Sequence, residues 1–318
     1  MSAIQANEGS MDAKIKELLA NLSKYAQTGE RFEFARWSQF TAFDIVMEMV
    51  FSEAPGFLRE ARDVGNALGS LYAIQAAAQV LGIYPRIVKI LHLPWIRRFG
   101  PQETDTTGPG AIIGLTAQAI NRRYAGKSGN DDRKDCLKWM MEYRDQNGNP
   151  MTKDEVIGEV MSPVLAGSDT AAVSIRVALL YLASNWPVRQ KMLAELDAAD
   201  AAGRLSKPVK YDEVKKLPYY DCVIKEVLRI HPVLGNALWR RVPKNGVTMN
   251  GFYIPGGTEI GVNPWVSSRN KEAYGDDADI FRPERWLETD PEKNRFRVQA
   301  DIYFGGGYCL CLGKFVIC

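Results

Sequence analysis

The stretch that decides the fold lies near the C-terminus and is Phe304-Gly305-Gly306-Gly307-Tyr308-Cys309-Leu310-Cys311-Leu312-Gly313. It places two cysteines in a glycine-rich loop that leads toward the expected start of a helix. Glycine has no side chain, so such a loop lets the backbone approach a flat ligand closely, and backbone N–H groups near a sulfur atom favour thiolate over thiol. The stretch therefore predicts a ligand-binding loop with a cysteine as its reactive group.

Two simpler interpretations of this loop compete with that prediction. Cys309 and Cys311 could belong to a zinc site, but zinc needs four ligands, and the neighbourhood offers only Cys318 as a further cysteine and no histidine. The glycines could instead make a plain turn in which both cysteines pack as small apolar groups. The loop alone leaves this second interpretation open.

The composition indicates a globular chain without a strong charge preference. Its 318 residues are 46% hydrophobic and carry 40 basic against 38 acidic side chains, so no excess of basic charge points to nucleic acid or an anionic membrane.

Five cysteines are too few for a disulfide framework in a chain of this length, which favours a reducing compartment. The apolar run 171–183 is interrupted by Ser174 and Arg176 and is too short to span a bilayer, and residues 1–10 lack the features of a signal peptide. We therefore expect a soluble or peripheral protein.

Hydrophobic periodicity divides the chain into a helical body and a short β-rich region. Residues 11–200 carry apolar side chains at spacings of three and four, which predicts about seven or eight helices. From Pro232 on, short β-branched and aromatic runs alternate with turns, as in residues 246–257, which predicts a small sheet appended to the helical body. The sequence contains no internal repeat and no long polar linker. We therefore expect a single domain over residues 1–318.

The longest expected helix covers residues 153–184 and contains two unusual features. Pro163 lies in its interior, where it removes a backbone hydrogen bond and should bend the helix. The small and polar run Ala166-Gly167-Ser168-Asp169-Thr170 follows in the middle of an otherwise apolar element. The alternative is two helices, with Ser168 or Asp169 as the N-cap of the second.

Two charged motifs follow the long helix. Glu226 and Arg229 are one turn apart on one face of the helix expected from Tyr219 to His231, and by themselves they predict a surface ion pair. The later run Phe281-Arg282-Pro283-Glu284-Arg285-Trp286 by itself predicts a loop anchored by its tryptophan.

The order of these motifs is more specific than any one of them. Ala-Gly-x-Asp-Thr is followed by Glu-x-x-Arg, then by Pro-Glu-Arg-Trp, then by Phe-Gly-x-Gly-x-x-x-Cys-x-Gly. A chain with this order resembles the cytochrome P450 family, the haem-thiolate monooxygenases, from about residue 11 to residue 318. Two further stretches are most similar to fungal members around pisatin demethylase; they are Trp95-Ile-Arg-Arg-Phe-Gly-Pro-Gln and Leu238-Trp-Arg-Arg-Val-Pro.

The resemblance implies a mainly α-helical prism with a small β-sheet and haem b as the cofactor. It makes Cys311 the thiolate ligand of the haem iron, with Phe304 packed beside it. Gly307 and Gly313 would allow the loop to lie against the macrocycle. A thiolate axial ligand favours O–O cleavage, which agrees with this chemistry.

On the other face of the haem, the resemblance places the helix 153–184. Ala166 and Gly167 would leave room for dioxygen, and Asp169 and Thr170 would deliver protons to it. A carboxylate and a hydroxyl on adjacent residues can supply and orient a proton without binding a metal.

The resemblance also assigns cations and a structural cluster. Glu226, Arg229 and Arg285 correspond to a buried charge network that supports folding and haem retention. Arg240 and Arg241 alternate sides of a strand, so at most one of them can face the haem propionates, and similarity to the fungal pattern favours Arg240. His231 is expected to be a helix C-terminal residue and not a metal ligand.

The chain departs from the family pattern in three places. Cys309 stands where the family usually has an arginine that bonds a haem propionate. A membrane anchor, the first strands and a helix with Trp-x-x-x-Arg are expected before the first motif and are not found. Only residues 312–318 follow Cys311, which leaves about two turns for the next helix. We therefore expect a fold that is incomplete at both ends.

The implied function is insertion of one oxygen atom from O2 into a small apolar organic substrate by hydroxylation or O-demethylation. Electrons would come from NADPH through a cytochrome reductase. Full-length members would be expected on the cytoplasmic face of the endoplasmic reticulum, but no membrane anchor is recognised in this chain. The competing hypothesis is a non-catalytic remnant with weak or no haem binding.

Overall fold

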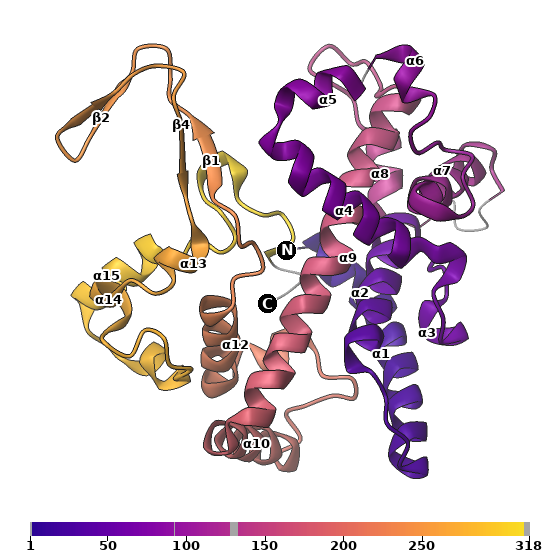
Figure 1. The fold of residues 1–318 in the computed structure, drawn as a ribbon. Helices are drawn as coiled ribbons and strands as arrows, with labels where there is room; N and C mark the ends of the chain where they lie inside the picture. The colour runs from indigo at the N-terminus through magenta and orange to yellow at the C-terminus, as the bar shows by residue number, and fades with distance from the viewer. Residues whose placement is uncertain (1, 92, 128–132, 315–318) are drawn as a thin grey trace. The chain divides into compact units, whose positions relative to one another are not determined.

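The computed structural model describes residues 2–91, 93–127 and 133–314 (Figure 1). The chain forms two compact units, Met1–Ala172 and Val173–Cys318. Both are mainly helical, as the sequence predicted. The expectation of a single domain stays a prediction, and each unit is described by itself.

In the part of the chain that the structure describes, the first unit consists of helices and connecting loops, with an isolated β-bridge between Arg144 and Pro150. Its helices are α1 (Ser2–Thr28), α2 (Phe34–Phe51), α3 (Phe57–Glu60), α4 (Ala67–Ile83), α5 (Pro85–Leu91), α6 (Pro94–Arg97), α7 (Ala111–Tyr124), α8 (Cys136–Glu142) and most of α9 (Lys153–Ser184), with 3-10 turns η1 (Val64–Asn66) and η2 (Gly108–Gly110). Together with α10 in the second unit, this agrees with the expected seven or eight helices once the four-residue elements α3 and α6 are left out.

The core of the first unit forms where α2, α3 and α9 meet. Phe57 of α3 stacks on Phe40 at 5.7 Å between ring centroids and meets Phe43 edge-on at 4.8 Å. Apolar residues of α9 at four-residue spacing, including Val156 and Val160, are fully buried in the same core. This packing fixes the N-terminal half of α9 against α2.

Asp44 anchors the start of α3 to α2. Its carboxylate accepts hydrogen bonds from the backbone N–H groups of Gly56, Phe57 and Leu58 at 3.0, 3.1 and 2.9 Å. Burial raises the pKa of Asp44, and the three backbone hydrogen bonds oppose that shift. The buried carboxylate therefore satisfies backbone donors at the beginning of a short helix.

Helix α9 is continuous from Lys153 to Ser184, with Pro163 inside it. The hydroxyl of Ser168 donates to the carbonyl of Val164 at 2.8 Å, whereas an N-cap side chain would accept from a backbone N–H. The two-helix alternative is therefore wrong. Packing of the helix on both sides of Pro163 outweighs the loss of one backbone hydrogen bond.

By length and composition, α9 could cross a membrane, and it is the only such helix in the described ranges. The apolar run 171–183 is by itself too short to span a bilayer. Helix α9 meets the length criterion because it extends well beyond that run. A core helix of a soluble protein satisfies the same criterion, and α9 contributes fully buried valines to the core of the first unit.

The second unit joins the C-terminal part of α9 to shorter elements. They are α10 (Trp186–Ala201), α11 (Tyr211–Val214), α12 (Pro218–Ile230), β1 (Leu238–Arg241), β2 (Val247–Met249), β3 (Phe252–Ile254), β4 (Glu259–Val262), α13 (Pro264–Ser267), α14 (Lys271–Tyr274), η3 (Pro283–Leu287), α15 (Pro291–Ala300) and η4 (Gly307–Cys309). Its main apolar cluster packs Val177 of α9 against Val223 and Val227 of α12, and Tyr181 stacks on Phe281 at 4.6 Å.

The strands form two separate two-stranded antiparallel sheets, β1–β4 and β2–β3, where the sequence predicted one small sheet. The β2–β3 hairpin turns at Asn250 and Gly251, whose φ angles are 51° and 81°. Both values are positive, as a tight two-residue hairpin requires, and Asn-Gly is the pair that adopts them at lowest cost. Along the chain this hairpin lies between β1 and β4, which pair with each other.

Candidate functional site

The predicted site residues belong to both units. Ala166, Gly167, Asp169 and Thr170 lie on α9 in the first unit. The second unit carries the other five, Arg240, Phe304, Gly307, Cys311 and Gly313. Each group has its own geometry.

The cysteine loop closes on itself through a backbone hydrogen bond. The N–H of Cys311 donates to the carbonyl oxygen of Phe304 at 2.8 Å, which places the backbones of these two residues side by side. Gly305 and Gly307 have φ angles of 76° and 61°, in the left-handed region that favours glycine. The loop conformation therefore requires glycine at Gly307. At Gly313 an added Cβ would make ordinary contact with the Cys311 sulfur at 3.6 Å.

The surface of this loop fits a flat apolar group. The thiol of Cys311 is exposed, and its neighbours Tyr308, Leu310 and Leu312 are exposed as well, Leu312 by 94%. Exposed apolar side chains around an exposed thiol would gain free energy when a planar hydrophobic ligand covers them. Such a surface is what a haem bound through Cys311 needs.

The zinc interpretation has no support among the described residues. No group of three or more histidine, cysteine, aspartate or glutamate side chains that could hold a metal ion is found there. Cys318, which that interpretation also used, and the short helix expected after the loop lie outside the described residues, apart from its first residue Lys314.

Strand β1 separates its two arginines as the alternation predicted. Arg241 pairs with Glu259 of β4, with 2.9 Å between Nη2 and Oε1. The guanidinium of Arg240 donates to the carbonyl of Trp239 at 2.7 Å and has no ion pair among the described residues. Of the two arginines, Arg240 is therefore the one whose charge is available to a carboxylate ligand. Its contact with a propionate stays a prediction.

On α9, the small residues have different environments. Ala166 is exposed, whereas a Cβ added to Gly167 would lie 2.9 Å from Cγ2 of Val46 on α2. Close packing of two helices thus requires glycine at position 167, in addition to any role toward dioxygen. The hydroxyl of Thr170 donates to the carbonyl of Ala166 at 2.8 Å. The side chain of Thr170 is therefore oriented along the helix beside Ala166.

The carboxylate of Asp169 lies between two glutamines of other helices. Nε2 of Gln39 on α2 donates to Oδ1 at 3.2 Å, and Nε2 of Gln75 on α4 donates to Oδ2 at 3.3 Å. Sequence analysis did not identify either glutamine, because each is far from Asp169 along the chain. A possible signal for Gln75 is its position as a polar residue inside the apolar run 73–78.

Glu226, Arg229 and Arg285 form a fully buried charge cluster, each with 0% exposure. The two oxygens of Glu226 accept from Nε and Nη2 of Arg229, both at 2.8 Å, and Oε1 also accepts from Nε of Arg285 at 2.9 Å. The indole of Trp286 donates to Oε2 at 2.9 Å. The remaining guanidinium N–H groups reach backbone carbonyls such as that of Ala278, and Nη1 of Arg285 also donates to the carboxylate of Asp277 at 3.1 Å. The surface ion pair suggested by the local sequence is therefore wrong, and the network implied by the resemblance is present.

His231 caps the C-terminus of α12, as expected. Its N–H donates to the carbonyl of Val227 at 3.1 Å, and its ring meets Trp265 edge-on at 4.9 Å. Burial lowers the pKa of His231 below 6.5, and the charge of Arg269 lowers it further.

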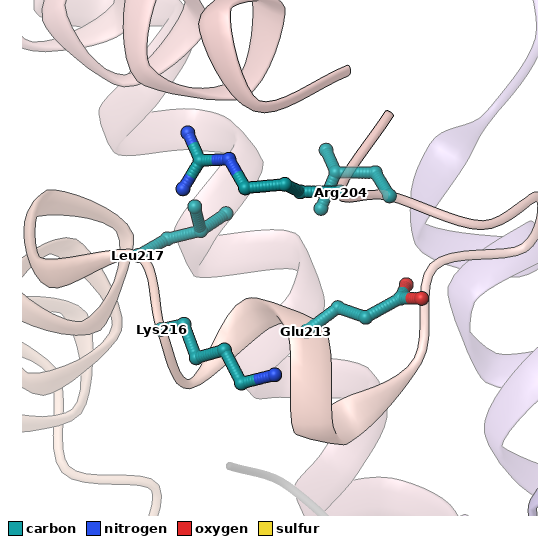
Figure 2. A pocket seen from close by; sticks show the side chains of 5 residues that line it. Arg204, Glu213, Lys216 and Leu217 are labelled. Carbon is teal, nitrogen blue, oxygen red and sulfur yellow. The ribbon is translucent and has the colours of Figure 1, made fainter. Parts of the chain in front are cut away.

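A cavity of about 230 Å³ in the second unit is separate from the predicted site residues (Figure 2). Its lining consists of Arg204, Leu205, Glu213, Lys216 and Leu217. The carboxylate of Glu213 already accepts backbone hydrogen bonds from Ser206 and Lys210, both at 2.9 Å. Glu213 therefore stabilises the turn between Ser206 and Lys210. The lining of the cavity contains none of the residues with predicted chemistry.

Known proteins are similar to this chain in sequence and in fold. A family model described as cytochrome P450 matches residues 2–316. A cytochrome P450 monooxygenase of Aspergillus terreus is 30% identical over 321 residues, covering 99% of this chain and 65% of the relative. Another, from Alternaria alternata, is 30% identical and is covered to 84% of its length. Pisatin demethylase of Fusarium vanettenii is 29% identical, over 99% of this chain and 60% of its own length.

A crystal structure of a cytochrome P450 has the same fold, with a TM-score of 0.76 at 22% identity, over 99% of this chain and 65% of that chain. The chain spans less than two thirds of the length of that protein and of the relatives from A. terreus and F. vanettenii. The resemblance inferred from the order of the motifs is confirmed. The chain belongs to the cytochrome P450 family.

Proposed function

We propose that the protein is a haem-thiolate monooxygenase that inserts one oxygen atom from O2 into a small apolar organic substrate. Hydroxylation and O-demethylation are the proposed reaction types, with electrons supplied from NADPH through a cytochrome reductase. The demethylation is suggested by the name of one relative, pisatin demethylase. The exposed thiol of Cys311 among uncovered apolar side chains is the observation that carries the proposal.

The residues of the chain have distinct proposed roles. When bound, the haem supplies the iron at which dioxygen is activated. Cys311 would hold the haem iron through its thiolate, and thiolate ligation favours O–O cleavage. Arg240 pairs with a propionate, and the small side chain of Ala166 leaves space on α9. Asp169 and Thr170 hold and transfer protons, which a carboxylate and a neighbouring hydroxyl can do without binding a metal.

The absorption spectrum of the purified, reduced protein with carbon monoxide tests this proposal. A thiolate-ligated band is expected. Haem bound without that band, or no haem after reconstitution, would contradict the proposal and favour a non-catalytic remnant of the family.

We expect Thr170→Ala to leave haem binding intact and to divert reducing equivalents into hydrogen peroxide. Product formed per NADPH should fall about tenfold or more, because a positioned proton donor contributes at least that factor. The measurement is the ratio of peroxide to product at equal NADPH consumption. Thr116→Ala is the matched control, since the Thr116 hydroxyl makes the same 2.8 Å bond to a carbonyl four residues earlier, on α7. Unchanged coupling in Thr170→Ala would exclude the proton-transfer role.

We expect Cys309→Arg to strengthen haem binding by roughly one to two orders of magnitude. A propionate without a cationic partner lacks a charge-assisted hydrogen bond worth about 1.5–3 kcal/mol, and arginine offers planar donors that match a carboxylate. Haem titration at equal ionic strength measures the change. Tyr308→Arg places the same charge on the adjacent exposed residue and is the control. No gain in Cys309→Arg would show that Arg240 already satisfies the propionate. An equal gain in both variants would show that added positive charge, and not a contact made from position 309, strengthens haem binding.

A further inference from the structure

We propose that Gln39 and Gln75 are positioning residues that hold the carboxylate of Asp169 in the orientation used for proton delivery. This inference rests on the proposed monooxygenase function. All three residues belong to the first unit, so the hydrogen bonds among them lie within that unit.

Each glutamine binds a different oxygen of the same carboxylate. Gln39 donates to Oδ1 at 3.2 Å and Gln75 donates to Oδ2 at 3.3 Å. A rotation of the carboxylate that exchanged its oxygens would break both hydrogen bonds on the way. Two donors from different helices, α2 and α4, therefore restrict rotation of the carboxylate more than either donor alone.

The clamp formed by Gln39 and Gln75 is attached to packed helices. Gln39 has 1% exposure, and its Nε2 also lies 3.5 Å from the carbonyl oxygen of Ser168, next to Asp169 on α9. Gly167, two residues before Asp169, packs against Val46 of the same helix α2. The distance between α2 and α9 is therefore set at this point, and with it the position of the Gln39 amide.

The chemistry of the donors suits a group that must take up and release a proton. Both amides are neutral, so their hydrogen bonds orient the carboxylate without placing a further charge beside it. Such an orienting contact is what a proton-transferring residue needs.

The first test measures the contact without haem. Gln75→Met removes the donor at similar size, and Gln79→Met changes an exposed glutamine one turn later on α4 as the control. We expect Gln75→Met to lower the unfolding midpoint by about 1–3 °C, and to lower it by much less when Asp169→Ala is already present. Equal losses in both backgrounds would overturn the proposed contact.

The second test measures the positioning role with haem bound. Gln75→Met should raise the peroxide fraction several-fold and lower kcat, with KM unchanged, whereas Gln79→Met should match the unmodified protein. Gln75→Glu has the same shape but donates only when protonated, so its coupling should recover as the pH falls, while that of Gln75→Met should not. A residue with a merely structural role would not produce this difference in pH profile.

The outcomes separate this inference from the function on which it rests. If the unmodified protein shows the thiolate band but Gln75→Met and Gln39→Met leave the peroxide fraction unchanged, the positioning role is wrong and the proposed function stands. If the unmodified protein lacks the band, the proposed function fails and the positioning role fails with it. Raised peroxide in both variants, with recovery at low pH only in Gln75→Glu, is the expected result.

Discussion

Replacement of Cys311 by serine is expected to abolish the thiolate-type band of the reduced, carbon monoxide-treated protein, whereas Cys309→Ser should keep it. A serine hydroxyl stays protonated at neutral pH and is a poor axial ligand, so no thiolate remains to donate electron density. Cys311 stands four residues after Gly307 and two before Gly313, and its N–H closes the loop onto Phe304. These features select it over Cys309.

Cys309→Ser is a matched control, because both thiols are exposed and lie in the same loop. Haem content measured in parallel distinguishes loss of the ligand from loss of the cofactor. A band that disappears in Cys309→Ser and persists in Cys311→Ser would reverse the assignment of the ligand.

Glu226→Gln is expected to lower the free energy of unfolding by about 3–5 kcal/mol, because it removes a buried counter-charge. The guanidinium of Arg229 is then left without a carboxylate partner among the described residues, and that of Arg285 keeps only Asp277. Glu226 accepts hydrogen bonds from Arg229 and Arg285, and all three side chains have 0% exposure. Such a loss is a large fraction of the roughly 5–15 kcal/mol that stabilises a typical domain. Urea unfolding followed by circular dichroism measures it.

The control for this prediction is Glu259→Gln, which breaks the exposed pair between Glu259 and Arg241. An exposed ion pair contributes about 0–1 kcal/mol, so this variant should unfold near the midpoint of the unmodified protein. If the two substitutions cost the same, the buried cluster does not stabilise the fold in the way inferred here.

Local features of the sequence were sufficient where one segment decides its own conformation. The bounds of the helix Lys153–Ser184 follow from apolar periodicity alone. The opposite orientation of Arg240 and Arg241 follows from the two-residue repeat of a strand. The turn of the cysteine loop at Gly307 likewise depends on one backbone angle that glycine adopts most easily.

The burial of charges and the partners of Asp169 depended on the tertiary structure. Glu226 and Arg229 would have the same spacing in an exposed ion pair and in a buried one. The pair is part of a buried cluster because Arg285, from a distant segment, packs against Glu226. The same is true of Gln39 and Gln75, because side-chain hydrogen bonds between helices leave no periodic trace in the sequence.

The sequence by itself determined the family, the two ends of the helical stretch 153–184, and the loop that carries Cys311, because each depends on the order and spacing of neighbouring residues. Only the tertiary structure decided that α9 continues through Pro163, that the strands form two sheets, and that Gly167 is required by Val46. The physical reason is that these three outcomes depend on packing between segments that are distant in sequence, and packing energies of several kcal/mol outweigh local preferences of about 1–3 kcal/mol.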